Sequence, residues 1–455
     1  MTAAGAAVRA RVRAAPSPVR PPRTLRPDRT TWPIWGFTAG LPLTFLAGLH
    51  GFWWCMPGVV FGARIIRKPT TTIPRSTFPL LVFLCWVPLG FSMLGIGNLP
   101  IFLYRWSLFA GCFTCVVWLT NTSEESVPTE RVVDWMAALW VALIAFGWIA
   151  QVLPTFHSKS PLTMLLGPAG GIDYIARISN WKFADYQALG AGRIARAAAP
   201  FGAANSWGSA VGILTPFFIR SWMVGTGRRR KRAGALLLAA AAIPIITSVN
   251  RGLWISLSLA FVYFTARKAL RGRFAPSVLL AIAMVGVAVA FVATPLGTIV
   301  QERLITAEDS NQSRAHIYED AWQGALESPL AGNGAPRPTH YYKGSPPVGT
   351  HGLIWYLMFC HGFVGLALFV TWMFTELVRS GSPPTTDAWW SHLTIFICVV
   401  QIPFYGLIPH VVLLGMAVGV AHRDLERGRA AQRRAAAVRL GRLGEADSGP
   451  ATVPA

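Results

Sequence analysis

The residues of this chain that could carry out chemistry are concentrated in one polar stretch, residues 296–350, inside an otherwise apolar second half. The stretch contains Arg303 and Arg314, and it ends beside His351, where the next apolar segment begins. A guanidinium group is permanently charged and can donate two parallel hydrogen bonds to a phosphate, and a neutral imidazole can accept a proton. These residue types therefore suit a site that binds a phosphate group and takes up a proton beside it. A polar loop of this length is more often functional than a simple connection.

Two further arginines stand next to apolar segments. Arg251 lies in the polar turn Asn250-Arg251-Gly252, between two short apolar segments. Such an arginine can extend to lipid headgroups, but the glycine beside it allows close approach to the backbone, and we favour a functional role. Arg196 lies near the end of a long segment, 154–203, which mixes Pro, Gly and aromatic residues with short apolar stretches and stands just before another apolar run. For Arg196 an anchor to headgroups and a contact to a ligand remain equally good interpretations.

The composition is that of an integral membrane protein. Of 455 residues, 53% are hydrophobic and 13% are charged, and the apolar residues come in runs near the length of about 20 residues that crosses a bilayer as a helix. Hydropathy predicts about twelve transmembrane helices, which form an all-α polytopic membrane helix bundle with a large, partly helical outer loop before the tenth span. The predicted spans are residues 32–49, 51–63, 77–97, 99–119, 132–153, 204–225, 233–249, 252–266, 275–296, 351–377, 388–406 and 407–421.

The net charge of +22 reflects the orientation in the membrane. Threading the spans puts the basic clusters on one side of the bilayer, as expected of cytoplasmic loops, so nucleic-acid binding is a poor interpretation of the charge. The clusters lie at residues 9–29, 64–68, 228–232, 267–273 and 423–439. We therefore predict a plasma or inner membrane protein with both termini in the cytoplasm. Residues 1–31 form a disordered basic tail, residues 32–421 the membrane domain with outer loops 154–203 and 297–350, and residues 422–455 a second basic tail.

The outer loop 297–350 has its own predicted structure. Apolar residues near helical spacing predict a helix over 315–326, with Ser313 as its N-cap and Arg314 in its first turn. A turn at 329–334 and an irregular segment rich in Pro, Gly and Tyr follow. His351 then stands where the loop meets the membrane. His316 and His340 lie in the same loop and are alternatives to it.

Metal binding is not favoured. The chain has no Asp-x-Asp, and the first two outer turns carry no carboxylate. Adjacent acidic pairs such as Glu308-Asp309 and Glu319-Asp320 point apart on a helix and usually only solvate it. Cys112 and Cys115 have the spacing of zinc ligands, but they lie inside a predicted span without a second pair, where thiols act as small apolar side chains. We predict metal-free chemistry with no cofactor.

In order along the chain, these motifs resemble the O-antigen ligase and polymerase superfamily, polytopic glycosyltransferases that use lipid-linked donors. Those that carry the resemblance are Asn250-Arg251-Gly252-Leu253-Trp254, then Ser313-Arg314 with Trp322, then Pro329-Leu330-Ala331-Gly332-Asn333-Gly334, then His351 with Gly362-Phe363-Val364-Gly365. The chain departs from the family twice. Asn250 stands where the first motif usually has Ser, and Gly352 stands where Asn usually follows the histidine.

The resemblance implies transfer of a glycan from a polyprenyl pyrophosphate to an acceptor hydroxyl at the outer face of the membrane. It assigns Arg251 and Arg314 to the pyrophosphate, and we add Arg196 as a third cation and Arg303 as a weaker candidate. It matches His351 to the family's essential histidine, which would act as general base. The acceptor, a glycolipid or glycan for a ligase and another lipid-linked repeat for a polymerase, stays open.

Two other classes of function remain alternatives. A transporter or flippase of a lipid-linked glycan should show internal repeats and charged residues near the bilayer midplane. We find no repeat, and Arg105 is the main charged residue within a span. A scaffold of cell-wall assembly is the third interpretation.

Overall fold

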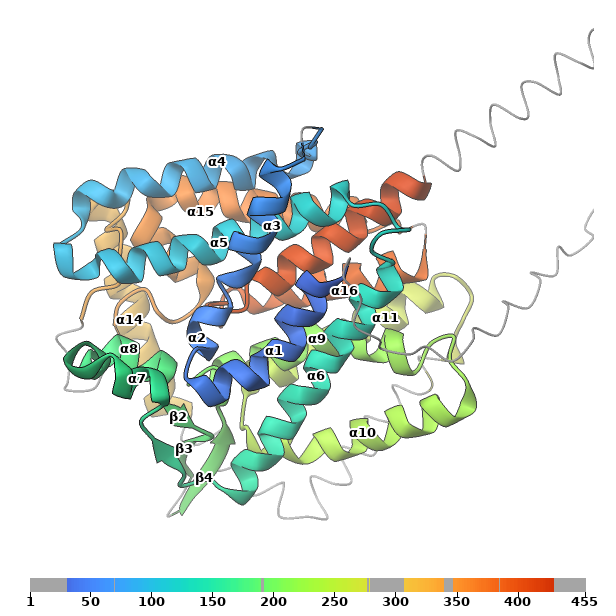
Figure 1. Cartoon of the computed structure of the whole chain (residues 1–455), viewed down its shortest axis with the longest axis horizontal. Coiled ribbons are helices and arrows are strands. Elements are labelled where there is room, and N and C mark those ends of the chain that lie inside the picture. Colours follow the sequence, from blue (N-terminus) through green and yellow to red (C-terminus); the bar gives the residue numbers. More distant parts are fainter. Residues whose placement is uncertain are drawn as a thin grey trace, which may run out of the picture.

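The computed structural model describes residues 31–275, 278, 307–338 and 347–428, apart from residues 69, 190, 191 and 384. The described chain is mostly helical (Figure 1). Several predictions concern residues outside it and stay predictions. They are the tail 1–30, the span 275–296 beyond its first residues, Arg303, His340 and the tail from residue 429.

The helices lie in chain order as follows: α1 (Trp32–Ala47), α2 (His50–Trp53), α3 (Met56–Ile66), α4 (Phe78–Trp86), α5 (Leu99–Asn121), α6 (Thr129–Val152), α7 (Pro161–Leu165), α8 (Asp173–Ser179), α9 (Ala204–Trp222), α10 (Arg228–Thr247), α11 (Arg251–Ala269), α14 (Ala307–Glu327), α15 (Leu353–Ser380) and α16 (Thr386–Gln401). A further helix covers residues 412–428. Short 3-10 helices flank α4 and precede α5.

Four segments of the described chain are long and apolar enough to cross a membrane: Arg75–Met93, Leu99–Asn121, Thr129–Val152 and Leu353–Ser380. They coincide with the predicted spans 77–97, 99–119, 132–153 and 351–377. The membrane-protein class is therefore confirmed, while the count of about twelve spans stays a prediction. The predicted span 51–63 contains a break, since a turn at residues 54–55 divides α2 from α3, whereas the turn between α1 and α2 lies at the predicted end of span 32–49.

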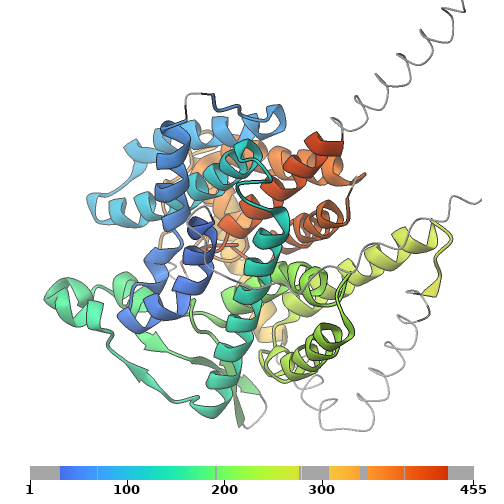
Figure 2. The same ribbon diagram turned by 45° about the vertical axis from the view of Figure 1, so that its right-hand side comes forward.

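The long helices pack around one continuous apolar core. Helix α6 packs along α9, α3 crosses α5, and α4 lies beside α15 (Figures 1 and 2). Aromatic rings fill the crossings: Phe61 stacks on Trp118 at 4.4 Å between centroids, and Trp140 on Phe218 at 4.0 Å. Such rings contribute large apolar areas in addition to favourable ring geometry.

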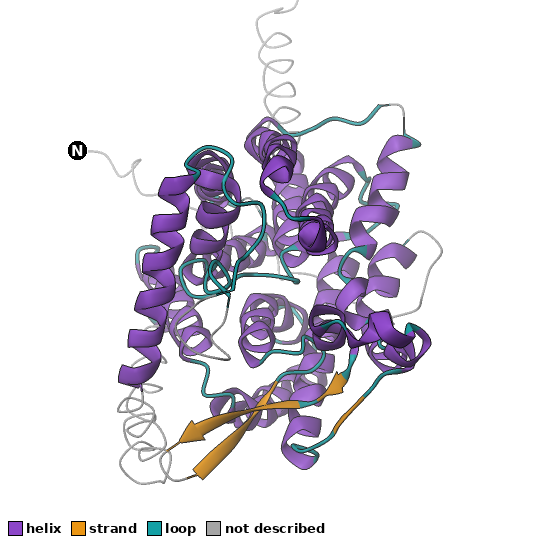
Figure 3. Ribbon diagram, turned by 90° about the vertical axis from the view of Figure 1, so that its left-hand side faces the viewer, coloured by secondary structure: helices purple, strands orange, loops and turns teal. Residues whose placement is uncertain are grey.

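The all-α prediction requires a correction in the segment 154–203. This segment contains two small antiparallel sheets, β1 (His157–Ser158) with β2 (Trp181–Lys182), and β3 (Ala184–Leu189) with β4 (Gly192–Ala197). The hairpin β3–β4, whose strands are orange in Figure 3, pairs Ala184 with Ala197, and β4 packs against α6, α9 and α10. These strands are too short for their alternation to stand out in hydropathy, which is why the sequence did not predict them.

The helix within the segment 297–350 is longer than predicted. It begins at Ala307 and ends at Glu327, so Ser313 is not its N-cap and Arg314 is not in its first turn. The acidic residues Glu308 and Asp309 stand at the new N-terminus, where negative charge favours a helix. The end of the helix and the turn that follows it lie where the sequence predicted them.

The last described helix extends the packed part of the chain beyond residue 421. His422, Arg423 and Asp424 are buried, and His422 Nε2 lies 2.7 Å from Glu376 Oε2 of α15. Arg423 and Arg427 form ion pairs with Glu124, which precedes α6. The boundary predicted between the membrane domain and the C-terminal tail falls inside this helix.

Candidate active site

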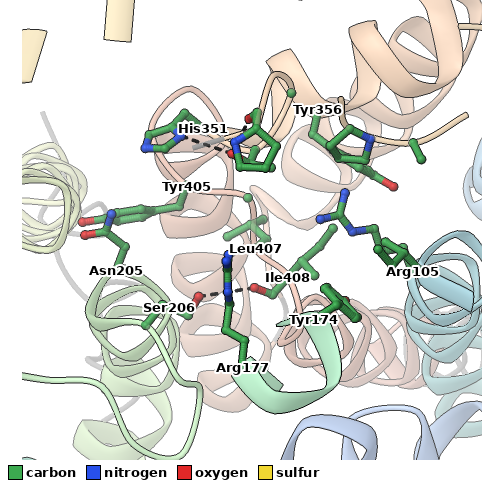
Figure 4. Close-up of a pocket in the computed structure, with 18 of the residues that line it drawn as sticks. Arg105, Tyr174, Arg177, Asn205, Ser206, His351, Tyr356, Tyr405, Leu407 and Ile408 are labelled. Carbon is green, nitrogen blue, oxygen red and sulfur yellow. Dashed lines mark hydrogen bonds between the residues drawn. The ribbon is translucent and has the colours of Figure 1, made fainter. Parts of the chain in front are cut away.

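A cavity of about 450 Å³ opens among segments that are far apart in the sequence. Its walls come from α5, α8, the first turns of α9, the segments around residues 335–338 and 347–356, and the connection 404–410 after α16 (Figure 4). The lining includes His351, Arg105, Arg177, Tyr174, Tyr356, Asn205 and His410. Among the predicted site residues whose side chains the structure describes, His351 lines this cavity and Arg196 and Arg251 do not.

His351 is held at the start of α15 by an unusual backbone. Its Nδ1 lies 3.3 Å from the hydroxyl of Thr350. The next residue, Gly352, has φ of +89°, and a Cβ there would lie 2.4 Å from the carbonyl oxygen of Pro403. Leu353 N–H donates to the carbonyls of Ile402 and Tyr405, both at 2.8 Å. Glycine after the histidine is thus a local steric requirement of this chain, because an asparagine at position 352 would collide with the 402–405 connection.

Two other described histidines differ in their relation to the cavity. His316 is exposed on α14 and does not line it. His410 does line it, and its Nε2 lies 2.8 Å from the hydroxyl of Ser209. That hydroxyl donates to Gln401 Oε1 at 2.6 Å, which ties the ring to a buried polar network. His410 could not be recognised from the sequence, because it stands alone in a run of apolar residues.

The turn that carries Arg251 packs directly behind the cavity. Asn250 caps α11 by accepting from Leu253 N–H at 3.3 Å, and its Nδ2 donates to Ala204 O at 3.2 Å. The polar residue at position 250 therefore joins the start of α11 to the start of α9. Arg251 itself begins α11 and does not line the cavity, but a Cβ on the adjacent Gly252 would lie 2.6 Å from the ring of Tyr405, which does.

Arg196 connects the hairpin to both neighbouring segments. From β4 its Nε donates to Ser248 O, its Nη1 to Gln187 Oε1 at 3.2 Å and its Nη2 to Asn205 Oδ1 at 2.9 Å. Asn205 is a wall of the cavity. Arg196 therefore contacts a residue of the cavity wall, Asn205, and it also donates to Ser248 in the turn that leads to Arg251.

Arg314 is placed by the packing of α14 on α15. Residues four apart share a helix face, so position 314 lies one turn before Tyr318. The ring of Tyr318 stacks on that of Trp355 at 4.3 Å, and Trp355 lies one turn after His351 on α15. The side chain of Arg314 is outside the described part of the structure, as is the whole of Arg303.

The turn at residues 329–334 is a structural support for α15. Asn333 donates from Nδ2 to Gly324 O at 2.8 Å and from its backbone N–H to Phe359 O at 2.8 Å. It sits against a break in α15 at Gly362, where φ is +68° and a Cβ would lie 2.2 Å from Leu330 O. The motif therefore fixes the helix that carries His351 at its start.

The cavity also contains polar residues that the sequence did not assign to a site. Arg105 lies over the ring of Tyr356, with its Cζ 4.9 Å from the ring centroid. Arg177 and Tyr174 reach the cavity from α8. Burial raises the pKa of Tyr174, and the charge of Arg105 opposes that shift only partly, so the phenol stays neutral and can donate a hydrogen bond. The one sequence signal was an arginine within an apolar span, at position 105.

No group of three His, Cys, Asp or Glu residues that could hold a metal ion occurs in the part of the chain that the structure describes. The four cysteines at positions 112, 115, 360 and 398 are buried, and the described cysteines are free thiols. Metal-free chemistry stays a prediction.

A comparison with protein families identifies the segment that holds most of these motifs. Residues 233–370 match the O-antigen ligase family. The match extends from α10 into α15 and includes Arg251, Arg314, the 329–334 turn and His351, so it confirms the resemblance to the O-antigen ligase and polymerase superfamily. No curated protein matches the chain. The cavity walls contributed by α5, α8 and α9 lie outside the matched O-antigen ligase segment.

Proposed function

We propose that this protein transfers a glycan from a polyprenyl-pyrophosphate donor to an acceptor sugar hydroxyl at the outer face of the plasma or inner membrane, without a metal ion. The observation that carries the proposal is the position of His351. It opens onto a polar cavity at the start of a membrane-spanning helix, inside the segment that matches the O-antigen ligase family. A lipid-linked donor presents its pyrophosphate at the membrane surface, so transfer requires a site at that depth.

In the proposed reaction the acceptor oxygen attacks the anomeric carbon of the donor glycan. His351 takes the proton of the acceptor hydroxyl, and the bond between the anomeric carbon and the pyrophosphate oxygen breaks with both electrons on the oxygen. A single displacement of this kind inverts the configuration at the anomeric carbon. A neutral imidazole suits the role because it can accept a proton at physiological pH.

Arg251 and Arg314 are proposed to bind the leaving pyrophosphate, with Arg303 as a further cation from the same loop. Fixed guanidinium groups stabilise charge that develops on a leaving group without having to reorganise. The turn before Arg251 and the residue after it contact cavity-lining segments. Arg196 contributes to the same end of the site, since it joins the Ser248 carbonyl to Asn205.

A ligase and a polymerase would share these steps and differ in the acceptor alone. A glycolipid or a glycan terminus would serve a ligase, and a second lipid-linked repeat would serve a polymerase. The cavity, at about 450 Å³, lies within the usual range of ligand pockets, about 300–1,000 Å³.

The test is reconstitution of the full chain in lipid vesicles with a polyprenyl-pyrophosphate glycan and a candidate acceptor. We expect release of the polyprenyl pyrophosphate together with growth or capping of the glycan, and no effect of a chelator. His351→Ala should stop transfer, whereas the control His316→Ala, on the exposed face of α14, should not. Movement of the intact lipid-linked glycan across the membrane without bond cleavage would instead identify a transporter or flippase.

A further inference from the structure

Residues that lie outside the segment matched to the family give the cavity a positive charge. Two arginines, Arg105 and Arg177, are among its lining residues, and no aspartate or glutamate of the described chain is. Arg105 comes from α5 and Arg177 from α8, both before residue 233. Figure 4 shows both guanidinium groups pointing into the space that His351 faces from another wall. A cation on each of two independent elements is therefore directed at whatever occupies this space.

Arg105 has polar atoms that the described protein does not satisfy. Its Nε and Nη1 are buried and have no hydrogen-bond partner in the part of the chain that the structure describes, and the polar groups next to the guanidinium are the hydroxyls of Tyr356 and Tyr174. The ionisable groups that act on its charge are Tyr356, Tyr174 and Cys360, and none of them is a carboxylate. A buried charge without a counter-ion is costly, and so are buried N–H donors without acceptors. An anion bound in the cavity would offset both costs.

The aromatic residues around Arg105 fix its direction. Tyr356 lies under the guanidinium, and its own ring stacks against Phe109 at 6.3 Å between centroids and meets His361 edge-on. Tyr174, on the other side, meets Tyr104 edge-on at 5.9 Å. Two packed rings leave Arg105 little freedom to turn away from the cavity. Arg177, by contrast, is an exposed side chain three residues after Tyr174, and it can move with an arriving ligand.

We propose that Arg105 and Arg177 form an oxyanion subsite that binds a phosphate or carboxylate group of the substrate. The inference rests on the proposed glycan transfer and adds a determinant of substrate charge. The oxyanion has two possible sources, the pyrophosphate of the lipid donor or the carboxylate of an acidic sugar. Arg105 supplies the rigid contact through its planar guanidinium, Tyr174 lies beside it as a neutral hydrogen-bond donor, and Arg177 closes over the anion from α8.

The experiment is a binding measurement on the full chain in lipid nanodiscs, with no turnover required. The probes are farnesyl pyrophosphate, a disaccharide that contains glucuronate, and the matching neutral disaccharide that contains glucose. The variants are Arg105→Gln and Arg177→Gln, and the control is Arg193→Gln, an exposed arginine of β4 that does not line the cavity. We expect each test variant to bind one of the two anionic probes about tenfold to a hundredfold more weakly than the wild type. The loss of a hydrogen bond to a charged group predicts an effect of this size. The neutral probe should bind alike to all variants.

The pattern of loss identifies the source of the anion. Weaker binding of farnesyl pyrophosphate alone assigns the subsite to the donor, and weaker binding of the glucuronate probe alone assigns it to an acidic sugar. Unchanged binding of both anions by Arg177→Gln and by a folded Arg105→Gln would overturn the proposal. If Arg105→Gln does not fold, the binding of the anionic probes by Arg177→Gln alone decides, because Arg177 is exposed. A wild-type chain that binds an anion through these arginines but transfers no glycan would refute the proposed function and leave the subsite standing.

Discussion

Arg196 and Ser248 are joined by a hydrogen bond from the guanidinium Nε to the backbone carbonyl, although they come from the β3–β4 hairpin and from the end of α10. The same guanidinium donates to Asn205 at the start of α9, at 2.9 Å. One side chain therefore fixes three segments around the turn that leads to Arg251. The interpretation of Arg196 as a lipid anchor does not account for these contacts.

Replacing Arg196 with alanine should reduce turnover because the turn before Arg251 loses its link to Asn205. Hydrogen bonds from a charged group contribute about 1.5–3 kcal/mol, so we expect a loss of about tenfold to a hundredfold in kcat/KM. The control is Arg193→Ala on the same strand, whose side chain is exposed. Equal activity of both variants in the vesicle assay would show that the contacts of Arg196 do not matter for transfer.

Arg251 and Arg314 should each be essential, and lysine should rescue neither fully. The loss of a fixed charge that stabilises a leaving group costs about a hundredfold to a thousandfold in turnover, as for oxyanion-hole donors. Lysine keeps the charge and loses the planar contact with two hydrogen bonds. The measurement is transfer by the Ala and Lys variants at equal expression. A folded Arg→Ala variant with wild-type turnover would reduce that arginine to an anchor at the membrane interface.

His351 should be required for the chemical step and not for donor binding. A general base contributes about a hundredfold to ten-thousandfold to the rate, through the transition state. Activity should also fall in acid, because a protonated imidazole has no lone pair for the acceptor proton. The comparison is of His351→Ala, His316→Ala, His340→Ala and His410→Ala, assayed together for transfer and for donor binding. If His351→Ala keeps full activity and another of these histidine variants loses it, the general base is that other histidine.

The sequence predicted the parts of the site that lie close to one another in the chain. The position of His351 at the start of a span, the turn before α11 and the turn after α14 follow from local composition and helix signals. Each can be seen in a short window of sequence, which is why each could be predicted. The N-terminus of α14 could not, because residues 308–314 are polar throughout and lack the apolar spacing that predicted the rest of the helix.

The cavity itself required tertiary packing. Arg105 and Tyr356 lie on different membrane-spanning helices, and nothing in either segment predicts that a guanidinium of one lies over a ring of the other. The place of His410 in the cavity could not be predicted for the same reason, since its partner Ser209 belongs to another helix, α9. An arginine within an apolar span was the usable signal, because a charge there needs a functional explanation.

Labelling from outside the cell tests the predicted orientation. Introduced cysteines at Lys159, in the first outer segment, and at Gly227, before the basic start of α10, should react oppositely with a reagent that does not cross membranes. Both positions are exposed or open, so reactivity reports the side of the membrane. The experiment needs a background without Cys85, the exposed native thiol among the described cysteines. Strong labelling at position 227 and none at position 159 would invert the topology and place the cavity in the cytoplasm.

Gly252→Ala tests whether the close packing of the α11 start against Tyr405, in the cavity wall, is needed for glycan transfer. A Cβ at position 252 would lie 2.6 Å from both Cζ and the hydroxyl oxygen of Tyr405, so the ring must shift from its place in the cavity wall. In an ordinary helix the same change stabilises by about 1 kcal/mol, so a loss of function would arise from the displaced ring.

The matched control is Gly227→Ala, because nothing lies within 4 Å of a Cβ at that position. We expect Gly252→Ala to lower kcat/KM by at least about tenfold, since small shifts of positioning groups have effects of this size or more. Gly227→Ala should keep wild-type transfer, and both variants should be expressed and folded alike. If Gly252→Ala transfers glycan as the control does, Tyr405 can be displaced without harm, and the start of α11 does not shape the site through it.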